Sequence, residues 1–303
     1  MKTVLIGGGS GLVGKRLSEL LRERGYTVQH LSRTPNPNAE FPRFGWDLQQ
    51  GTIDQAAVER ADIIINLAGE GIADGRWTPA RKKRIIASRV DSTRLLIKAL
   101  QQSEKQPQAF ISSAAVGYYG NRGDRLLHES DEPGKGFLTE SCLEWEKAIE
   151  EATVTGIRTV ALRIGVVMST QGGALEKMLI PLRFFMATYF GNGGQWYSWI
   201  HIDDLCRMFL FAIENEQLSG FYNAVAPNPE TNKDLTKTLA KASGKPALVM
   251  PVPGFMLRLI FGEMADTILF STRVTSEKIE QAGFEFRFPR LEPALRDLLA
   301  RKI

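Results

Sequence analysis

Short apolar runs alternate with segments of helical periodicity through the first half of the chain. Strands are predicted where β-rich runs occur, at residues 2–8, 27–33, 61–69, 109–115 and 158–168. Helices are predicted between them, at residues 12–25, 79–100 and 142–152. Thr78 and Pro79 form a favourable N-cap and first-turn pair for the second helix. This alternation predicts an α/β protein with a doubly wound parallel sheet.

The rhythm changes after about residue 170. The stretches 170–178 and 190–199 are rich in glycine and aromatic residues, and they are typical of loops or a cap around a pocket. A helix is expected to begin near Asp203–Asp204, with one of these aspartates as its cap. A strand is expected at 221–226 and a short aromatic strand at 284–288. We therefore expect a smaller C-terminal substrate or cap region.

A glycine-rich loop follows the first predicted strand and opens the first predicted helix. Glycine lets the chain turn sharply and lets a diphosphate approach the backbone without a Cβ in the way. Free N–H groups and the helix dipole then attract the anion. The pattern predicts a dinucleotide site in a Rossmann-type domain, formed by Gly8, Ser10, Gly11, Leu12, Val13 and Gly14. A tight turn that holds no ligand is the alternative.

The end of the second predicted strand indicates which dinucleotide binds. An NAD site usually has a carboxylate there for the ribose 2′-OH, whereas a 2′-phosphate requires a cation. This strand ends with Ser32, which can donate a hydrogen bond, and Arg33, which can bind or stack. The pair favours NADP. In the alternative interpretation Arg33 is a solvated surface residue and the acidic partner lies elsewhere, with Asp47 as one candidate.

Composition excludes several classes of protein. The 303 residues are 43% apolar and 24% charged, as in an ordinary soluble protein, and the net charge of +4 does not by itself indicate nucleic acid. Cys142 and Cys206 are too few and too far apart for a disulfide framework or a zinc site. The chain shows no run that is typical of a signal peptide or a membrane span, so we expect a cytoplasmic protein.

Motifs along the whole chain resemble the atypical, epimerase-like branch of the extended short-chain dehydrogenase/reductase superfamily. They include GGGSGLVG, NLAGE, VGYYG, WEKA, RIGVV and QWYSWIHIDDL, and the last fifty residues resemble the C-terminal domain of unknown function in that branch. Its members are often labelled nucleoside-diphosphate-sugar epimerases. The resemblance implies an oxidoreductase or epimerase that uses NADP(H) and a small-molecule substrate. Because extended members are often dimers, it also makes a homodimer the prior expectation.

The resemblance assigns further residues and boundaries. It implies that Ser32–Arg33, Leu67–Ala68 and Arg89 line the cofactor, and that Val166 lies near the nicotinamide. Gly69 ends a predicted strand, and its loop is expected at the carboxyl edge of the sheet beside the cofactor. We expect the NADP-binding domain at residues 1–170, completed by segments around 197–226. The substrate or cap region is expected at 171–196 and 227–303, with the C-terminal domain at about 250–300.

The usual catalytic residues are missing. Typical members of the superfamily use a serine and a Tyr-x-x-x-Lys pair, in which the lysine lowers the pKa of the proton-transferring tyrosine. Counted from Glu146 in WEKA, the tyrosine position holds Leu138 and the lysine position holds Cys142. The serine position falls on Ala114. None of these three side chains performs the proton transfer of the usual set.

Substitute catalytic groups lie near these positions. Our candidates are Tyr119, Tyr118 and Ser113, and other titratable or reactive groups nearby are Glu140, Cys142 and His201. Each has a structural alternative: packing for the tyrosines, burial for the cysteine, and a structural hydrogen bond for the histidine. The aromatic stretch 183–193 replaces glycine-rich sequence of the relatives and is expected to narrow or reshape the substrate side.

Two functions are consistent with these observations. The first is an NADP(H)-dependent epimerase or reductase acting on a nucleotide-sugar-like or small carbonyl substrate. The second is an NADP(H)-binding regulator or redox sensor that has lost its chemistry. The glycine loop fits both, the missing catalytic set favours the second, and the aromatic pocket loops favour the first.

Overall fold

A single large sheet organises the molecule. The computed structural model describes residues 1–301. The sheet has eight strands in the order β13 (Gly220–Ala224), β8 (Arg158–Ile164), β6 (Ala109–Ala115), β5 (Ile63–Asn66), β1 (Thr3–Gly7), β2 (Thr27–Ser32), β3 (Arg43–Asp47) and β4 (Thr52–Ile53). All neighbours are parallel except β3 and β4, which form a hairpin. This arrangement confirms the doubly wound Rossmann-type sheet.

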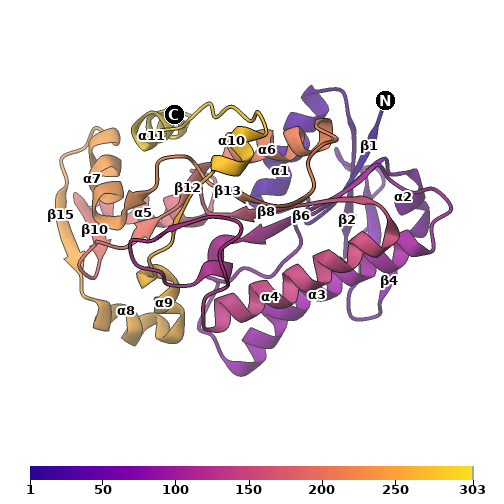
Figure 1. Cartoon of the computed structure of the whole chain (residues 1–303). Coiled ribbons are helices and arrows are strands. Elements are labelled where there is room, and N and C mark those ends of the chain that lie inside the picture. The colour runs from indigo at the N-terminus through magenta and orange to yellow at the C-terminus, as the bar shows by residue number, and fades with distance from the viewer. Residues whose placement is uncertain (302–303) are drawn as a thin grey trace.

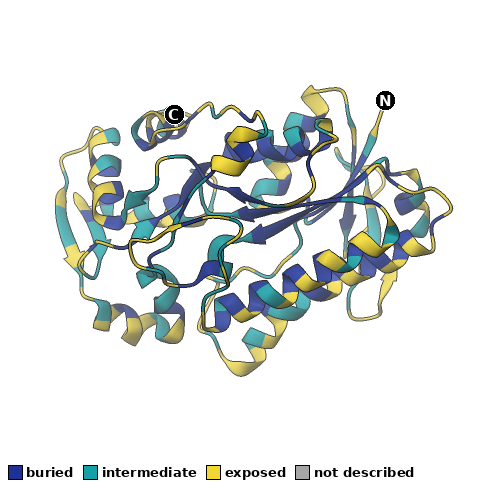
Figure 2. Cartoon of the chain, viewed as in Figure 1, coloured by how far each residue is buried: buried dark blue, intermediate teal, exposed yellow. Residues whose placement is uncertain are grey.

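Helices cover both faces of the sheet (Figure 1). One face carries α1 (Leu12–Glu23) and α6 (Ile202–Glu214), and the other carries α3 (Pro79–Gln101) and α4 (Phe137–Glu150). The inward sides of these helices are buried and their outward sides exposed (Figure 2), because apolar residues recur along each helix at the spacing of one face. The short α2 (Gln55–Arg60) and the 3-10 turn η2 (Glu151–Thr155) complete this part.

Local signals in the sequence place several helix ends correctly. The hydroxyl oxygen of Thr78 accepts a hydrogen bond from the backbone N–H of Arg81, and Pro79 is the first residue of α3. Gly25, just beyond α1, has a φ of +83°, a conformation that glycine adopts without strain. The predicted start of α3 at Thr78–Pro79 and the predicted end of α1 at Gly25 are therefore confirmed.

Apart from α6 and β13, much of the chain after residue 171 lies beyond the carboxyl ends of β6 and β8 (Figure 1). Its helices are α5 (Gly173–Leu182), α7 (Asn232–Ala242), α8 (Gly254–Phe261), α9 (Ala265–Leu269), α10 (Glu277–Gln281) and α11 (Leu291–Ala300), with the 3-10 turn η3 (Gly262–Met264). Short strand pairs join β10 (Met186–Phe190) to β15 (Leu248–Val252), β11 (Trp196–Tyr197) to β14 (Glu230–Thr231), β12 (Trp199–His201) to β9 (Val166–Met168), and β16 (Arg273–Val274) to β7 (Leu126–Leu127). The proposed domain boundaries stay a prediction.

Two expectations about this half are wrong. The stretch 170–178 is not only a loop, because α5 begins at Gly173. Residues 284–288 form no strand: the backbone N–H groups of Arg287 and Phe288 donate to the carboxylate of Asp204 at 2.9 and 2.8 Å. Phe184 and Phe185 are 67% and 60% exposed, and the expected effect of stretch 183–193 on the substrate side stays a prediction.

β3 is not among the strands expected from the sequence, although Phe44 and Trp46 alternate along it with smaller or charged residues.

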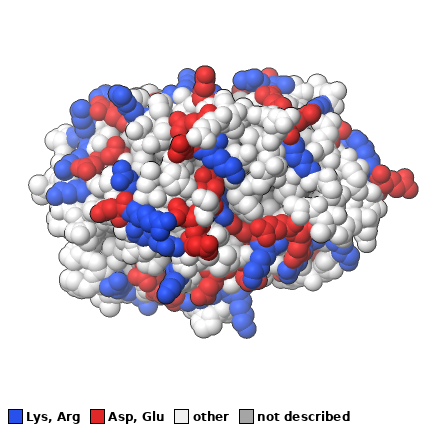
Figure 3. Space-filling model, in the orientation of Figure 1, with Lys and Arg blue, Asp and Glu red and all other residues white. Residues whose placement is uncertain are grey.

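Charge on the surface is mixed: Lys and Arg lie among Asp and Glu on the face shown in Figure 3. Within residues 1–301, none of the helices combines the length and the apolar character that crossing a bilayer requires.

Candidate functional site

The glycine loop joins β1 to α1 and lies against the end of β5. Gly8 has a φ of +80°, and a Cβ on it would lie 2.7 Å from the carbonyl carbon of Leu67. A Cβ on Gly14 would lie 2.5 Å from the carbonyl oxygen of Gly8. Two of the motif glycines are therefore required by contacts within the protein itself. Glycine at these positions brings the start of α1, the loop and the end of β5 together at one edge of the sheet.

The amino end of α1 offers unpaired donors. Its N-cap residue, Gly11, has no side chain to bond the first turn, and that turn contains no acidic residue. The backbone N–H groups of Leu12 and Val13 find no acceptor among residues 1–301, while Ser10 is exposed beside them. Such donors, together with the helix dipole, make the loop suited to an anion.

The loop after β5 carries the next predicted residues. The backbone N–H of Leu67 donates to the carbonyl oxygen of Gly7 at 2.8 Å, and that of Ala68 donates to the Asn66 side chain at 3.1 Å. A Cβ on Gly69 would lie 3.1 Å from Cζ of Arg89, so the guanidinium lies directly against this glycine. The structure thus brings Leu67, Ala68, Gly69 and Arg89 together beside the glycine loop.

Arg89 is held in place from two sides. Its Nη1 donates to the carbonyl oxygens of Glu70 at 3.1 Å and Ile85 at 2.9 Å, and Cζ lies 5.2 Å from the centroid of the Trp145 ring. Burial lowers the pKa of Arg89. Its Nε and Nη2 have no acceptor within the part of the chain that the structure describes, so both remain available to a ligand.

A cavity of ≈ 580 Å³ opens beside the end of β2. Arg33 lines it and is exposed, with no hydrogen bond or ion pair to any described residue. Ser32 has a local role, because its Oγ accepts the N–H of Thr34 at 3.1 Å. Asp47 also lines the cavity, and its Oδ1 accepts the N–H groups of Gln49 and Gln50 at 2.7 and 3.1 Å.

Val166 begins β9, apart from the glycine loop in sequence. Its backbone N–H donates to the carbonyl oxygen of Ser198 at 2.8 Å, which joins β9 to the chain before β12. A Cβ on the preceding Gly165 would collide with that same oxygen, so the chain can make this contact only with glycine there. The side chain of Val166 is partly buried.

The positions of the usual catalytic set are apolar or neutral in this structure. On α4, Leu138 and Cys142 both face Gly117, with the sulfur 3.3 Å from where a Cβ of that glycine would lie. Burial raises the pKa of the Cys142 thiol to about 12, so it remains a thiol at neutral pH. Ala114 packs with Trp145 and Ile149 beneath α4.

Tyr119 lies in η1 (Val116–Tyr119) and is fully buried. Its hydroxyl donates to Oδ1 of Asn223 at 2.7 Å and accepts from Nη1 of Arg163 at 2.9 Å. Arg163 in turn makes a two-point ion pair with Glu146, with distances of 2.9 and 2.8 Å. Burial raises the pKa of Tyr119 to about 12 despite the nearby guanidinium. These polar groups satisfy one another away from solvent.

Tyr118 and Ser113 have different surroundings. The ring of Tyr118 is partly exposed, and Cζ of Arg163 lies 3.7 Å from its centroid. Burial raises the pKa of Tyr118. Ser113 is buried, and its hydroxyl donates to the carbonyl oxygen of Asn66 at 3.1 Å. Among the three candidates, Tyr118 therefore has the most access to a ligand.

His201 has a structural role. It is the N-cap of α6, where its Nδ1 accepts the N–H of Asp203 at 3.0 Å, so neither aspartate is the cap that the sequence suggested. The Asp203 carboxylate instead binds Arg16 at 2.7 Å and Arg301 at 2.6 Å. Burial lowers the pKa of His201. Glu140 is exposed on the first turn of α4.

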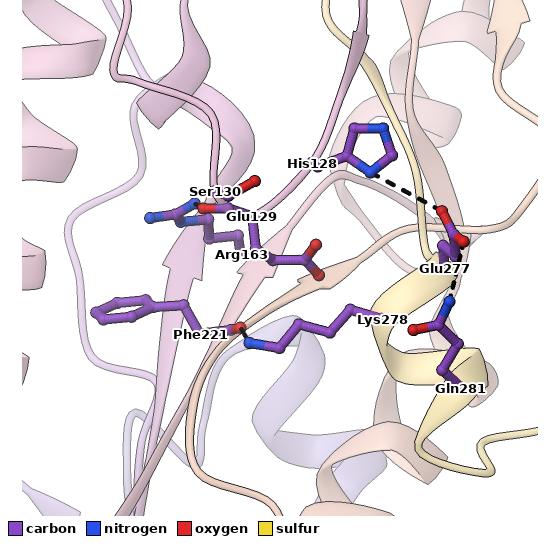
Figure 4. Close-up of a pocket in the computed structure, with 8 residues that line it drawn as sticks. All are labelled: His128, Glu129, Ser130, Arg163, Phe221, Glu277, Lys278 and Gln281. Carbon is purple, nitrogen blue, oxygen red and sulfur yellow. Dashed lines mark hydrogen bonds and ion pairs between the residues drawn. The ribbon is translucent and has the colours of Figure 1, made fainter.

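A second cavity, of ≈ 520 Å³, lies at the β13 edge of the sheet and contains none of the predicted site residues (Figure 4). Lys278 points to β13 and donates to the carbonyl oxygen of Phe221 at 2.7 Å. The carboxylate of Glu129 accepts the backbone N–H of Asn223 at 2.8 Å. These charges cover an open strand edge, which is a structural use.

The chain matches known families over most of its length. Residues 4–224 match the family described as the NAD dependent epimerase/dehydratase family, and residues 252–298 match a domain of unknown function, DUF1731. The epimerase family protein SDR39U1 of Mus musculus is 36% identical over 307 residues, which cover 98% of this chain and 99% of the mouse protein.

Solved structures show the same similarity. The human epimerase family protein SDR39U1 (isoform 2), solved with NADPH, superimposes with a TM-score of 0.88 at 31% identity, over 98% of this chain and 99% of the human one. A nucleoside-diphosphate sugar epimerase from Corynebacterium glutamicum gives a TM-score of 0.81 at 34% identity, over 99% of this chain and 58% of the other.

Proposed function

The chain belongs to the NAD dependent epimerase/dehydratase family, as its motifs suggested, and we propose that it binds NADP(H) across the glycine loop. The observation that carries the proposal is the unpaired amino end of α1, packed against β5 beside Arg89 and Arg33. The NADPH in the human SDR39U1 structure supports the choice of cofactor. NADP(H) supplies hydride exchange at its nicotinamide ring when it is bound.

Each predicted residue has a definite part in this proposal. The N–H groups of Leu12 and Val13 hold the diphosphate, and the exposed Gly11 leaves that approach free of a side chain. Gly8 and Gly14 allow the close packing of the loop that places these N–H groups. Arg33 binds the 2′-phosphate, beside Ser32. Leu67, Ala68 and Gly69 form the wall of the site, and Arg89 adds its free Nε and Nη2 donors. Val166 lies at the nicotinamide end.

For the reaction we propose epimerisation or reduction of a nucleotide-sugar-like or other small carbonyl substrate. Tyr118 is the group that we assign to polarise the substrate oxygen, because it is partly exposed and stacks on the Arg163 cation. Tyr119 and Ser113 then orient the surrounding chain, since their hydroxyls already have protein partners. A cytoplasmic location and a homodimer remain predictions.

The alternative is an NADP(H)-binding regulator or redox sensor. It is favoured by one observation: Leu138, Cys142 and Ala114 occupy the usual catalytic positions, where two side chains carry no ionisable group and burial keeps the third a thiol of raised pKa. A sensor requires the cofactor site alone, so it would bind NADPH without consuming it.

A turnover assay separates the two functions. The purified protein is loaded with NADPH, and the loss of its fluorescence is followed after adding a panel of nucleotide sugars and small carbonyl compounds. A reductase oxidises the bound NADPH with at least one of the carbonyl compounds. Epimerisation leaves the cofactor unchanged overall, so it is measured with the NADP⁺-loaded protein as conversion of a nucleotide sugar into its epimer. In either case Tyr118→Phe slows turnover while cofactor affinity is kept. Tight NADPH binding with neither oxidation nor epimer formation across the whole panel supports the sensor instead. Unchanged turnover in Tyr118→Phe removes Tyr118 from the chemistry.

A further inference from the structure

A second guanidinium borders the cavity that contains Arg33. Arg43 is the first residue of β3, and β3 pairs with β2 so that Gly45 lies opposite Ser32. The connection between the two strands folds back on itself: the N–H of Asn36 donates to the carbonyl oxygen of Arg43 at 2.9 Å, and the reverse bond measures 3.0 Å. This closed loop brings Arg33 and Arg43, ten positions apart in sequence, to one cavity of ≈ 580 Å³.

Neither guanidinium is neutralised by the protein. Arg43 is exposed, and like Arg33 it has no hydrogen bond and no ion pair within 4.0 Å in the part of the chain that the structure describes. The acid of the connecting loop, Glu40, already pairs with Arg22 at 2.6 Å. Many other arginines of this protein have carboxylate partners, such as Arg94 with Glu151. Two unpaired cations on one cavity are therefore a distinctive feature.

The carboxylates in the cavity are committed to the backbone. Asp47 accepts two N–H groups of the β3–β4 turn, and Asp54 caps α2 by accepting the N–H of Ala57 at 3.0 Å. Neither lies within ion-pair distance of Arg33 or Arg43, although all four residues line the same space. The cavity thus keeps a positive side next to the end of β2, where a dinucleotide on the glycine loop places its ribose.

We propose that Arg43 is a second specificity residue for the 2′-phosphate of NADP(H), acting together with Arg33. The inference rests on the proposed function, because it requires the dinucleotide to lie across the glycine loop. A phosphate group has enough acceptor oxygens and charge for two guanidiniums, and guanidinium–phosphate bonds are charge-assisted and directional. Arg43 is supplied by a strand that follows β2, so the usual inspection of the residues at the end of β2 misses it.

The test compares ligands that differ by this phosphate. Dissociation constants are measured for NADPH, NADH, 2′,5′-ADP and 5′-AMP with the wild type, Arg43→Gln and Arg33→Gln. Arg43→Gln weakens NADPH and 2′,5′-ADP by about tenfold or more, the size expected for a lost charge-assisted bond. It leaves NADH and 5′-AMP unchanged. Arg43→Lys, which keeps the charge but not the fork, gives an intermediate loss.

A matched control removes the same charge outside the cavity. Arg60 stacks over the Phe44 ring with its Cζ 5.1 Å from the centroid, and it does not line the cavity. Arg60→Gln should keep the preference of the wild type for NADPH. The inference is overturned if Arg43→Gln keeps the preference for NADPH over NADH. It is also overturned if Arg60→Gln weakens that preference as much as Arg43→Gln does. A wild type that binds neither dinucleotide overturns the proposed function itself, which is a different result from intact binding without a role for Arg43.

Discussion

The glycine-loop edge and the Tyr119 region use their polar groups in opposite ways. At the glycine loop, the N–H groups of Leu12 and Val13 and the guanidinium of Arg33 have no partner among the described residues. By contrast, the Tyr119 hydroxyl bonds to Asn223 and Arg163, Arg163 pairs with Glu146, and all four residues are buried. Open donors are suited to a ligand, whereas satisfied and buried groups are suited to holding the fold.

This difference explains why the glycine motif predicts a binding site, whereas the VGYYG motif does not predict a catalytic one. The tyrosine pair of VGYYG lies near the expected active site in sequence, but Tyr119 points into a closed network and has a pKa of about 12. A group that is buried and has both partners cannot exchange a proton with a substrate without breaking that network. The open donors of the glycine loop are therefore suited to binding the cofactor, whereas the buried bonds around Tyr119 stabilise the fold.

The largest expected effect on stability comes from removing Glu146 from the buried network of Glu146, Arg163, Tyr119 and Asn223. Glu146→Ala leaves the buried Arg163 cation without its carboxylate, so we expect the free energy of unfolding to fall by about 3–5 kcal/mol. Urea unfolding followed by circular dichroism measures this loss. The matched control is Glu151→Ala, which breaks an exposed ion pair with Arg94 and should cost about 1 kcal/mol or less. Equal losses in the two variants would show that the network does not stabilise the fold.

A pH effect of intermediate size is expected beneath the glycine loop. His30 is buried against Gly9, and its Nε2 lies 2.8 Å from Oγ of Ser18. Burial, and then the nearby Arg43, lower the pKa of His30 to about 4. Between about pH 6.5 and 4 the unfolded chain binds a proton that the folded protein does not, so stability decreases as the pH falls, by up to about 3 kcal/mol.

The histidine's contribution can be isolated by substitution. His30→Leu removes the titrating group, so the difference in unfolding free energy between this variant and the wild type should change with pH over that window. His128→Leu, which replaces an exposed histidine, is the matched substitution control. A pH profile that is the same with and without His30 would contradict the assigned cause.

The smallest effect on stability is expected from removing the buried hydroxyl of Tyr119. Tyr119→Phe leaves the buried Oδ1 of Asn223 without its donor and removes one of the two acceptors of Arg163 Nη1, so we expect a loss of about 1–3 kcal/mol in stability with unchanged NADPH affinity. Thermal unfolding and a fluorescence titration measure the two quantities. Tyr222→Phe is the control, because its buried ring has no hydroxyl hydrogen bond to any residue in 1–301. If Tyr119→Phe abolished turnover while stability was kept, Tyr119 would be a catalytic residue after all.

Local chemistry made part of this molecule predictable. The Thr78–Pro79 start of α3, the Gly25 stop after α1 and the glycine loop each depend on a few adjacent residues, and the sequence states them directly. Alternation of apolar runs with helical segments gave the sheet for the same reason.

The missed features depend on contacts between distant segments. Arg43 reaches the cavity only because residues 33–42 fold back, and its signal was the alternation of Phe44 and Trp46 in β3. Residues 284–288 form no strand, because Asp204, about eighty positions earlier, takes two of their backbone donors. Such partners are chosen by the tertiary fold, so periodicity and spacing do not specify them.

If a dinucleotide binds across the glycine loop, alanine in that loop weakens its binding. Two loop variants and one control variant test this directly. Gly8 and Gly25 both have positive φ values, of +80° and +83°, so Gly8→Ala and Gly25→Ala introduce similar backbone strain. A Cβ on Gly8 meets the end of β5 at 2.7 Å, whereas one on Gly25 meets nothing within 4 Å. Gly11→Ala adds a methyl group to the loop at a φ of −73°, without that strain.

The measurement is the NADPH dissociation constant of the wild type and the three variants, with thermal unfolding to establish that each is folded. We predict that the wild type and Gly25→Ala bind NADPH alike, and that Gly8→Ala and Gly11→Ala bind it at least about tenfold more weakly. A wild type that takes up no NADPH at millimolar concentration, or loop variants that bind as tightly as Gly25→Ala, would contradict the account.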